Sequence, residues 1–349
     1  MSNEFEYQIK EWGDIKEDYS KGSLIIGNGA SMALHSKFGF SSLKEKAEEL
    51  LLFNEDISML FKEFDTTDFE LILRLVWHAK LINEKLNIED CKTNQAYENI
   101  KNALIQVVRE VHCTRDKIED QLPQLYEFTK YFSTIVSLNY DLLLYWIRMY
   151  GNDLKINNDG HIFKDCFIGG GVFDHDWEKF QKPYRSEKAI TLTFYQHGSL
   201  AIFRDIFNTE KKLKALEDSK LLDTITQHWT DDKIPLFVAE GTGEKKKESI
   251  KTSPYLSTVF YEVLPSLIKD KDKDKDKTNL VIYGWGMGQQ ESHLIEQIFK
   301  PESKGKVAIS TYSKDQKECH RISTEIKKLA PHVEVEFFDS QSSGCWNNP

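Results

Sequence analysis

The chain has 349 residues, of which 40% are hydrophobic and 29% charged, and its formal net charge is −10. This is ordinary globular composition, without any stretch near the ~18 apolar residues of a membrane span. The acidic balance argues against a broad nucleic-acid footprint, which needs a clustered basic face. The length fits about two domains, or one α/β core with insertions.

The N-terminus and the cysteines narrow the class of protein. Residues 1–6 contain acids and no basic region before an apolar run, so we expect no secretory signal and a cytoplasmic protein. Five scattered cysteines form no Cys-x-x-Cys pair. A zinc ribbon is therefore not expected, and we predict no metal.

A glycine turn follows the first predicted strand. Residues 1–21 are expected to form an arm, and the domain is expected to span 22–349. Residues 23–26 read as a short buried strand, and Gly27-Asn28-Gly29-Ala30-Ser31 then opens a helix, where backbone amides can converge on an anion such as a nucleotide phosphate. Ser31 can cap the helix or donate to a phosphate oxygen. The alternative is a plain strand-to-helix turn, because the third glycine of the dinucleotide fingerprint is absent.

Helices are predicted next, over about residues 42–130. Ser42 and Glu45 form a capping box that opens a helix over 43–53. Further helices are expected over 69–77, 79–86 and 97–112. This block lies between two predicted strands of one sheet, so we interpret it as an inserted helical subdomain or cap.

The second clear strand, residues 133–138, ends in two polar side chains. Asn139 and Asp141 follow it directly, and polar residues at the carboxyl end of a buried parallel strand are where α/β ligand sites form. We therefore expect both to contact a ligand. The alternative for Asp141 is that it only caps the helix that begins at Leu142.

A histidine ends the strand predicted over 190–195, after a stretch (151–190) in which no regular structure is expected. His197 precedes a glycine, which suits a general base, and its ordinary pKa near 6.5 fits that role. The alternative is a turn histidine satisfied by hydrogen bonds. Residues 205–233 are expected to be helical and 235–240 a strand. The turn at 241–243 is a candidate for the same crevice. The lysines at 245–247 predict a solvated face, the alternative being a lysine near phosphate.

The last third alternates strand and helix. After an exposed charged run at 269–277, the strand over 279–283 leads into a second glycine turn, Gly284-Trp285-Gly286-Met287-Gly288, and a helix over 292–298. Strands over 307–312 and 333–338 flank a helix over 320–329. Such alternation predicts parallel crossovers, hence a Rossmann-like, mostly parallel sheet with helices on both faces. Two glycine turns suggest a nucleotide held from both halves of it.

Four motifs, in this order along the chain, resemble the sirtuin-like superfamily. They are Gly27–Ser31, Leu138–Asp141, His197–Ser199, and Gly284–Gly286 followed by Glu291 and His293. The resemblance runs from about residue 22 to 340 and is closest to the bacterial branch that hydrolyses NAD, often in anti-phage defence. The segment Asp68-Phe69-Glu70 also looks like the acidic-aromatic segment of that branch.

The resemblance implies roles for these residues. NAD would extend across the switch point of the sheet with its pyrophosphate on the first glycine turn. Asn139 would orient the nicotinamide-side ribose and the water, Asp141 would contact the carboxamide or order the loop, and His197 would be the base. The residues expected to bind NAD are Gly27, Asn28, Gly29, Ala30, Ser31, Gly198, Gly284, Trp285, Gly286 and Glu291.

The function that follows is an NAD glycohydrolase, a regulated effector that acts as a homo-oligomer or with a partner protein. Departures from the deacylases bear on this. The zinc-ribbon cysteines are missing and residues 39–43 lack the Pro-Asp-Phe-Arg segment, which disfavours acyl-lysine binding. Asn28 replaces a usual alanine, and Gly286 stands where serine is common. The alternatives are a non-hydrolysing NAD or ADP-ribose sensor and, less favoured, a deacylase or ADP-ribosyltransferase.

Overall fold

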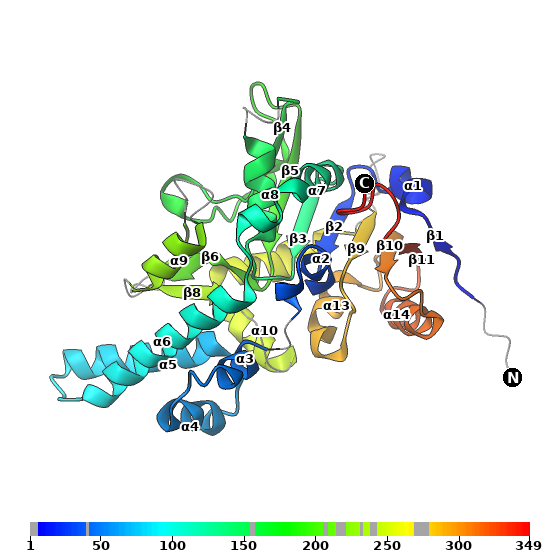
Figure 1. Ribbon diagram of the computed structural model, residues 1–349. Helices are drawn as coiled ribbons and strands as arrows, with labels where there is room; N and C mark the ends of the chain where they lie inside the picture. Colours follow the sequence, from blue (N-terminus) through cyan, green and yellow to red (C-terminus); the bar gives the residue numbers. More distant parts are fainter. Residues whose placement is uncertain are drawn as a thin grey trace, which may run out of the picture.

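The centre of the protein is an eight-stranded sheet (Figure 1). The computed structural model describes residues 6–39, 42–153, 158–204, 209–213, 221–230, 233–237, 243–268 and 279–349. The strand order is β1-β11-β10-β9-β2-β3-β5-β4, and each neighbouring pair is parallel. The strands are β1 (Ile9–Lys10), β2 (Ser23–Ile26), β3 (Thr134–Ser137), β4 (His161–Lys164), β5 (Ala189–Tyr195), β9 (Leu280–Tyr283), β10 (Gly305–Thr311) and β11 (Val333–Asp339).

The strand order places a switch point between β2 and β9. From β2 the chain builds β3, β4 and β5 on one side, and it then crosses to build β9, β10 and β11 on the other. All residues of β2, β3 and β9 are buried, as expected for central strands covered on both faces. The predicted Rossmann-like α/β fold is confirmed. Ligands in such sheets bind outside the strand ends at the switch point.

The helical insertion between β2 and β3 is also present. It contains α3 (Leu43–Glu49), α4 (Glu55–Glu63), α5 (Phe69–Lys85), α6 (Cys91–Val111) and α7 (Leu122–Thr129). The two helices expected over 69–86 are one, α5, which pairs with α6 in a long projection from the sheet (Figure 1). Asp68 accepts the Leu71 N–H at 3.2 Å at the start of α5, and neither Asp68 nor Phe69 lines the cavity described below.

A second sheet departs from the predicted parallel alternation. The strands β7 (Glu210–Lys212), β6 (Gly198–Arg204) and β8 (Ile234–Phe237) pair antiparallel in that order. Gly198, with φ +75°, allows the sharp turn out of β5, and a Cβ there would lie 2.1 Å from the Leu236 carbonyl oxygen. The strand expected over 235–240 therefore belongs to this small sheet.

Two edge strands of the large sheet escaped prediction, and so did β7 of the small sheet, which lies where a helix was expected over 205–233. β4 lies in the stretch where no regular structure was expected, and β1 lies within the expected arm. Both are short and mostly half-buried, because an edge strand of the sheet has one partner only, so neither shows the apolar run of a central strand. Residues 269–277, which were expected to be exposed, and residues 241–242 of the predicted turn lie outside the described residues.

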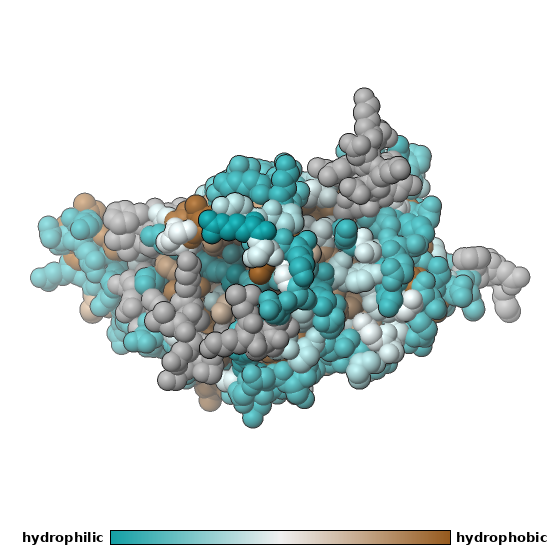
Figure 2. All heavy atoms as spheres, turned by 90° about the horizontal axis from the view of Figure 1, so that it is seen from above, coloured by the Kyte–Doolittle hydropathy of each residue, from teal (hydrophilic) through white to brown (hydrophobic). Residues whose placement is uncertain are grey.

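The remaining helices surround the sheets. They are α1 (Trp12–Ile15), α2 (Asn28–Met32), α8 (Leu143–Asn152), α9 (Leu221–Thr230), α10 (Gly243–Lys251), α11 (Pro254–Thr258), α12 (Leu264–Ser266), α13 (Ser292–Ile298) and α14 (Gln316–Leu329). Within the described ranges, none of the helices combines the length and apolarity that a membrane span requires. Figure 2 shows a largely hydrophilic face, with brown apolar spheres mainly toward the α5–α6 projection, where Ile82, Leu86 and Ile88 are exposed.

Candidate functional site

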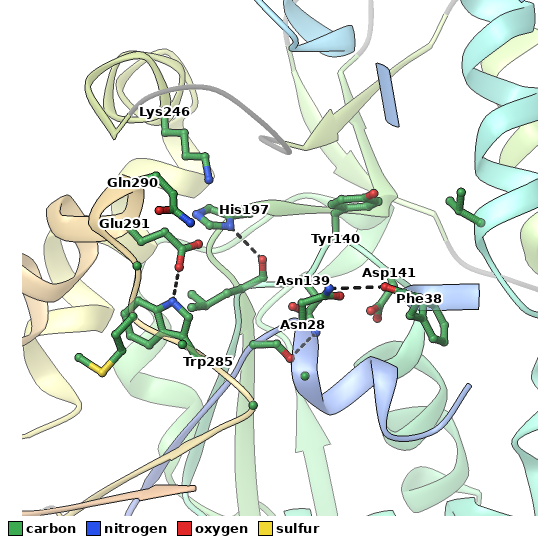
Figure 3. Close-up of a pocket in the computed structure, with 18 of the residues that line it drawn as sticks. Asn28, Phe38, Asn139, Tyr140, Asp141, His197, Lys246, Trp285, Gln290 and Glu291 are labelled. Atoms are coloured by element: carbon green, nitrogen blue, oxygen red, sulfur yellow. Dashed lines mark hydrogen bonds between the residues drawn. The ribbon is translucent and has the colours of Figure 1, made fainter. Parts of the chain in front are cut away.

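A cavity of about 500 Å³ lies at the switch point, beyond the carboxyl ends of β2, β3 and β9. Its volume is within the range of small-molecule sites. Helices α2, α10 and α13 gather at this end of the sheet (Figure 1). Figure 3 shows side chains from several elements converging on it. The lining residues include Gly27, Asn28, Gly29, Phe38, Val108, Val111, His112, Asn139, Tyr140, Asp141, His197, Lys246, Gly284, Trp285, Gly286, Gln290 and Glu291.

The two glycine turns pack directly against each other. The Gly27 N–H donates to the Tyr283 carbonyl at 2.9 Å, and the Gly29 N–H donates to the Gly284 carbonyl at 2.8 Å. A Cβ on Gly27 would lie 2.7 Å from the Gly284 oxygen and from Trp285. The Ala30 N–H also has a partner, the Gly27 carbonyl at 3.0 Å. The expectation that these amides converge on an anion is therefore wrong for 27, 29 and 30, and the glycines serve the contact between turns.

A buried network joins the first turn to the end of β3. The Ser31 hydroxyl donates to Asp141 Oδ2 at 2.5 Å and accepts from Asn139 Nδ2 at 2.9 Å. Asn139 Nδ2 also donates to the Gly27 carbonyl at 2.9 Å, and Asp141 Oδ1 accepts the Leu143 N–H at 2.9 Å. Asp141 thus accepts the first N–H of α8, although the N-cap position itself is Leu142, and it also lines the cavity. Within the described residues the Asn139 amide oxygen accepts no hydrogen bond, so it is open to a ligand.

His197 presents one free ring nitrogen to the cavity. Its Nδ1 lies 2.9 Å from the Leu138 carbonyl, so Nδ1 carries the proton and Nε2 is an acceptor (Figure 3). Among the described residues Nε2 has no partner. Burial first, and the charge of Lys246 second, lower the pKa of His197 to about 3. The ring is therefore neutral over the physiological range, and one of its two nitrogens is not satisfied by the turn.

Lys246 is the chief residue missing from the predicted site. It was expected on a solvated face, but it is 6% exposed, and it lines the cavity from α10. Ile250, four residues on, is buried on the same helix. The apolar Ile250 at i+4 could have indicated that Lys246 lies on the buried face of the helix, because residues at this spacing share one helix face.

The helical insertion supplies a further wall of the cavity that the sequence did not point to. Phe38 precedes the insertion, and Val108, Val111 and His112 come from the end of α6. His112 Nδ1 lies 2.7 Å from the Cys113 carbonyl, and its Nε2 accepts the Leu142 N–H at 3.0 Å. It thereby holds the loop after Asn139, and burial lowers its pKa.

The second glycine turn is braced by side chains. Trp285 donates its indole N–H to Glu291 Oε2 (Figure 3). The Arg321 guanidinium on α14 donates to the carbonyls of Gly286 at 2.7 Å and Met287 at 3.0 Å. A Cβ on Gly286 would meet no atom within 4 Å, so this residue borders open space in the cavity.

Most, but not all, of the predicted residues meet at this cavity. Three do not line it: Ala30 and Ser31 are fully buried beneath the first turn, and Gly198 is buried at the start of β6, against β8. The other ten line it: Gly27, Asn28, Gly29, Asn139, Asp141, His197, Gly284, Trp285, Gly286 and Glu291. No group of three or more His, Cys, Asp or Glu side chains suited to a metal ion occurs in the part of the chain that the structure describes.

Comparison with known proteins places the chain in a family. No curated protein matches the sequence. The family model described as "Domain of unknown function (DUF4917)" matches residues 24–346. This range includes all of β2 except Ser23, both glycine turns and every residue of the cavity. The chain therefore belongs to the DUF4917 family.

Proposed function

We propose that the protein is an NAD glycohydrolase, which uses water to cleave NAD into nicotinamide and ADP-ribose. One observation carries the proposal. A neutral histidine with a free Nε2, His197, faces the same cavity as the Asn139 amide and both glycine turns, at the switch point of a Rossmann-like sheet. Such switch points are where dinucleotides bind in this class of fold. The sirtuin-like motif order adds support.

The residues fit the demands of the reaction. Nicotinamide leaves as a neutral molecule and the ribose passes through an oxocarbenium-like state, so no strong acid is needed. The Asp141 carboxylate supplies negative potential to that cation. His197 Nε2 accepts a hydrogen bond from the attacking water or a ribose hydroxyl, and the Asn139 oxygen fixes the water or ribose. Oxygen of water bonds to the anomeric carbon as the bond to nicotinamide breaks, and a proton is released.

A second candidate, binding of NAD or ADP-ribose without turnover, has an observation in its favour. A histidine whose pKa is lowered to about 3 is a weak proton acceptor. Asp141 already accepts hydrogen bonds on both carboxylate oxygens, from Ser31 and Leu143. A cavity with only weak bases suits a sensor whose ligand stays intact and regulates a partner.

Nicotinamide release from purified protein tests the two candidates. We expect release from wild type and from the control His332→Ala, which alters an exposed histidine, and loss of release in His197→Ala and Asn139→Ala. Absence of nicotinamide in every assembly state, or equal release by all four proteins, contradicts hydrolysis. Calorimetry that shows NAD binding while NAD stays intact for hours favours the sensor. Acyl-peptide and ADP-ribosyl-transfer assays test the less favoured activities.

The proposal includes regulation by assembly or by a partner protein, in anti-phage defence. Exposed apolar side chains on the helical insertion, Leu51 at 89% and Leu86 at 65%, support a contact surface there. Light scattering with and without NAD measures the oligomeric state. Plaque counts and cellular NAD in bacteria that express wild type or His197→Ala test the biological role, and equal plaque counts contradict it.

A further inference from the structure

We infer that Lys246 is the phosphate-binding residue of the cavity, so that the phosphate or pyrophosphate of a ligand lies beside α10 and not on the first glycine turn. The inference rests on the proposed function in taking NAD as the ligand that carries the pyrophosphate. The cavity's own residues indicate that the ligand carries a multiply charged phosphate.

The first observation is a buried cation that has no anionic partner among the described residues. Lys246 is 6% exposed, and it forms no ion pair or hydrogen bond with any other described residue. Taking an ammonium group out of water is unfavourable unless a charge or hydrogen-bond partner compensates. Its side chain points from α10 toward His197 and Gln290 at the cavity wall (Figure 3). The cavity therefore holds a positive charge that an anionic ligand can neutralise.

The second observation concerns the groups beside Lys246. His293 is 6% exposed, and neither of its ring nitrogens has a partner among the described residues. It stacks on Phe260, with the ring centroids 6.1 Å apart and the planes at 22°. Burial and the nearby Lys246 lower the pKa of His293 to about 4, so its ring is neutral and offers one N–H. That N–H is a donor without an acceptor, beside the same cation.

The start of α10 adds to this potential. The helix has nine residues and begins at Gly243, where a Cβ would lie 3.3 Å from His293 Nδ1. The amino end of a helix carries partial positive charge, which favours anions. Lys246 and this helix end therefore reinforce one another at the cavity, and His293, which does not itself line it, lies beside them.

Most donors of the first glycine turn are already used. The amides of Gly27, Gly29 and Ala30 already donate to backbone carbonyls, and the Ser31 hydroxyl donates to Asp141. The helix α2 that follows has only five residues. A pyrophosphate placed there would meet three amides that are occupied, whereas at α10 it meets a buried cation that lines the cavity.

Calorimetry with two probes tests the inference. Inorganic pyrophosphate and NAD are titrated into wild type, Lys246→Met and the control Lys251→Met, which removes an exposed charge from the same helix. Charge-assisted hydrogen bonds contribute enough that we expect about tenfold to hundredfold weaker binding of both probes to Lys246→Met. Binding to Lys251→Met stays within about threefold of wild type, because exposed charges contribute little. Nicotinamide riboside, which has no phosphate, binds Lys246→Met as it binds wild type.

The outcomes separate this inference from the proposed function. Equal weakening of NAD and nicotinamide riboside, or unchanged binding of NAD and pyrophosphate, overturns the role of Lys246. Nicotinamide release at the wild-type rate and KM in Lys246→Met overturns it too, and leaves the hydrolase standing. If the wild-type protein does not bind NAD but Lys246→Met weakens the binding of pyrophosphate, the phosphate subsite is supported and NAD is contradicted as the ligand. If Lys246→Met fails to fold, Lys246→Gln removes the charge and keeps a polar side chain, and unchanged pyrophosphate binding in folded Lys246→Gln overturns the inference.

Discussion

Substitution of Gly27 by alanine tests whether the first glycine turn serves close packing against the second turn or the binding of a ligand. The new Cβ would lie 2.7 Å from the Gly284 oxygen and from the Cα and Cβ of Trp285. Ordinary contacts begin at 3.4 Å, so the two turns must separate by about 0.7 Å, the difference of these distances. The φ of Gly27 is −106°, so alanine adds no backbone strain of its own.

The structure indicates a large cost for Gly27→Ala. The atoms in the way are mostly backbone, and backbone cannot rotate aside as a flexible side chain does. Overpacking costs roughly 1–3 kcal/mol. Separation of the turns also stretches the hydrogen bonds from Gly27 to Tyr283 and from Gly29 to Gly284, at about 1 kcal/mol each. We therefore expect the free energy of unfolding to fall by about 3–5 kcal/mol.

Gly286→Ala is the matched control on the other turn. Its Cβ meets nothing within 4 Å, and the φ of Gly286 is not positive, so the folded state accepts it and stability changes by less than about 1 kcal/mol. Because Gly286 borders the cavity, we expect weaker nucleotide binding instead. Urea denaturation followed by tryptophan fluorescence measures stability, and calorimetry measures binding. If Gly27→Ala is as stable as wild type, the turns do not depend on close packing and the reasoning fails.

Three further predictions concern the groups around the cavity. Ser31→Ala removes a hydroxyl bonded to Asp141 and Asn139, so urea denaturation should show a loss of about 1.5–3 kcal/mol, and a loss under 0.5 kcal/mol contradicts this network. Arg321→Ala releases two carbonyls of the second glycine turn, so calorimetry should show weaker nucleotide binding. Stability should stay nearly unchanged, because the Arg321 side chain is partly exposed. Unaltered affinity contradicts the idea that Arg321 holds this turn in place. The pKa of His197 is about 3 in the folded chain against 6.5 ordinarily, so the unfolded chain binds a proton that the folded chain refuses. The free energy of unfolding therefore falls as the pH drops below about 6.5, and His197→Gln should lessen this fall between pH 7 and 5. If the free energy of unfolding depends on pH equally in both proteins, the lowered pKa of His197 is refuted.

Local patterns were enough to predict the central part of the fold. Continuous apolar runs marked β2, β3 and β9, because a strand covered on both faces must be apolar throughout. The residues directly after such strands must lie at one edge of a parallel sheet, so Asn139 and the two glycine turns could be placed together without coordinates. The edge strand β4 and the antiparallel β6–β8 sheet could not, since their pairing depends on distant partners.

The use of each polar group was decided only by tertiary structure. A glycine turn looks the same in sequence whether its amides face a ligand or another turn; here the β2 and β9 turns meet, and the amides of Gly27 and Gly29 are occupied. A lysine in a charged run looks solvated until its helix is docked, yet Lys246 lies at the cavity wall. Apolar pattern and parallel pairing are enough to predict which strand ends meet. The packing of α10 and the two turns determined which atoms remain free for a ligand, because hydrogen-bond partners come from segments far apart in the chain.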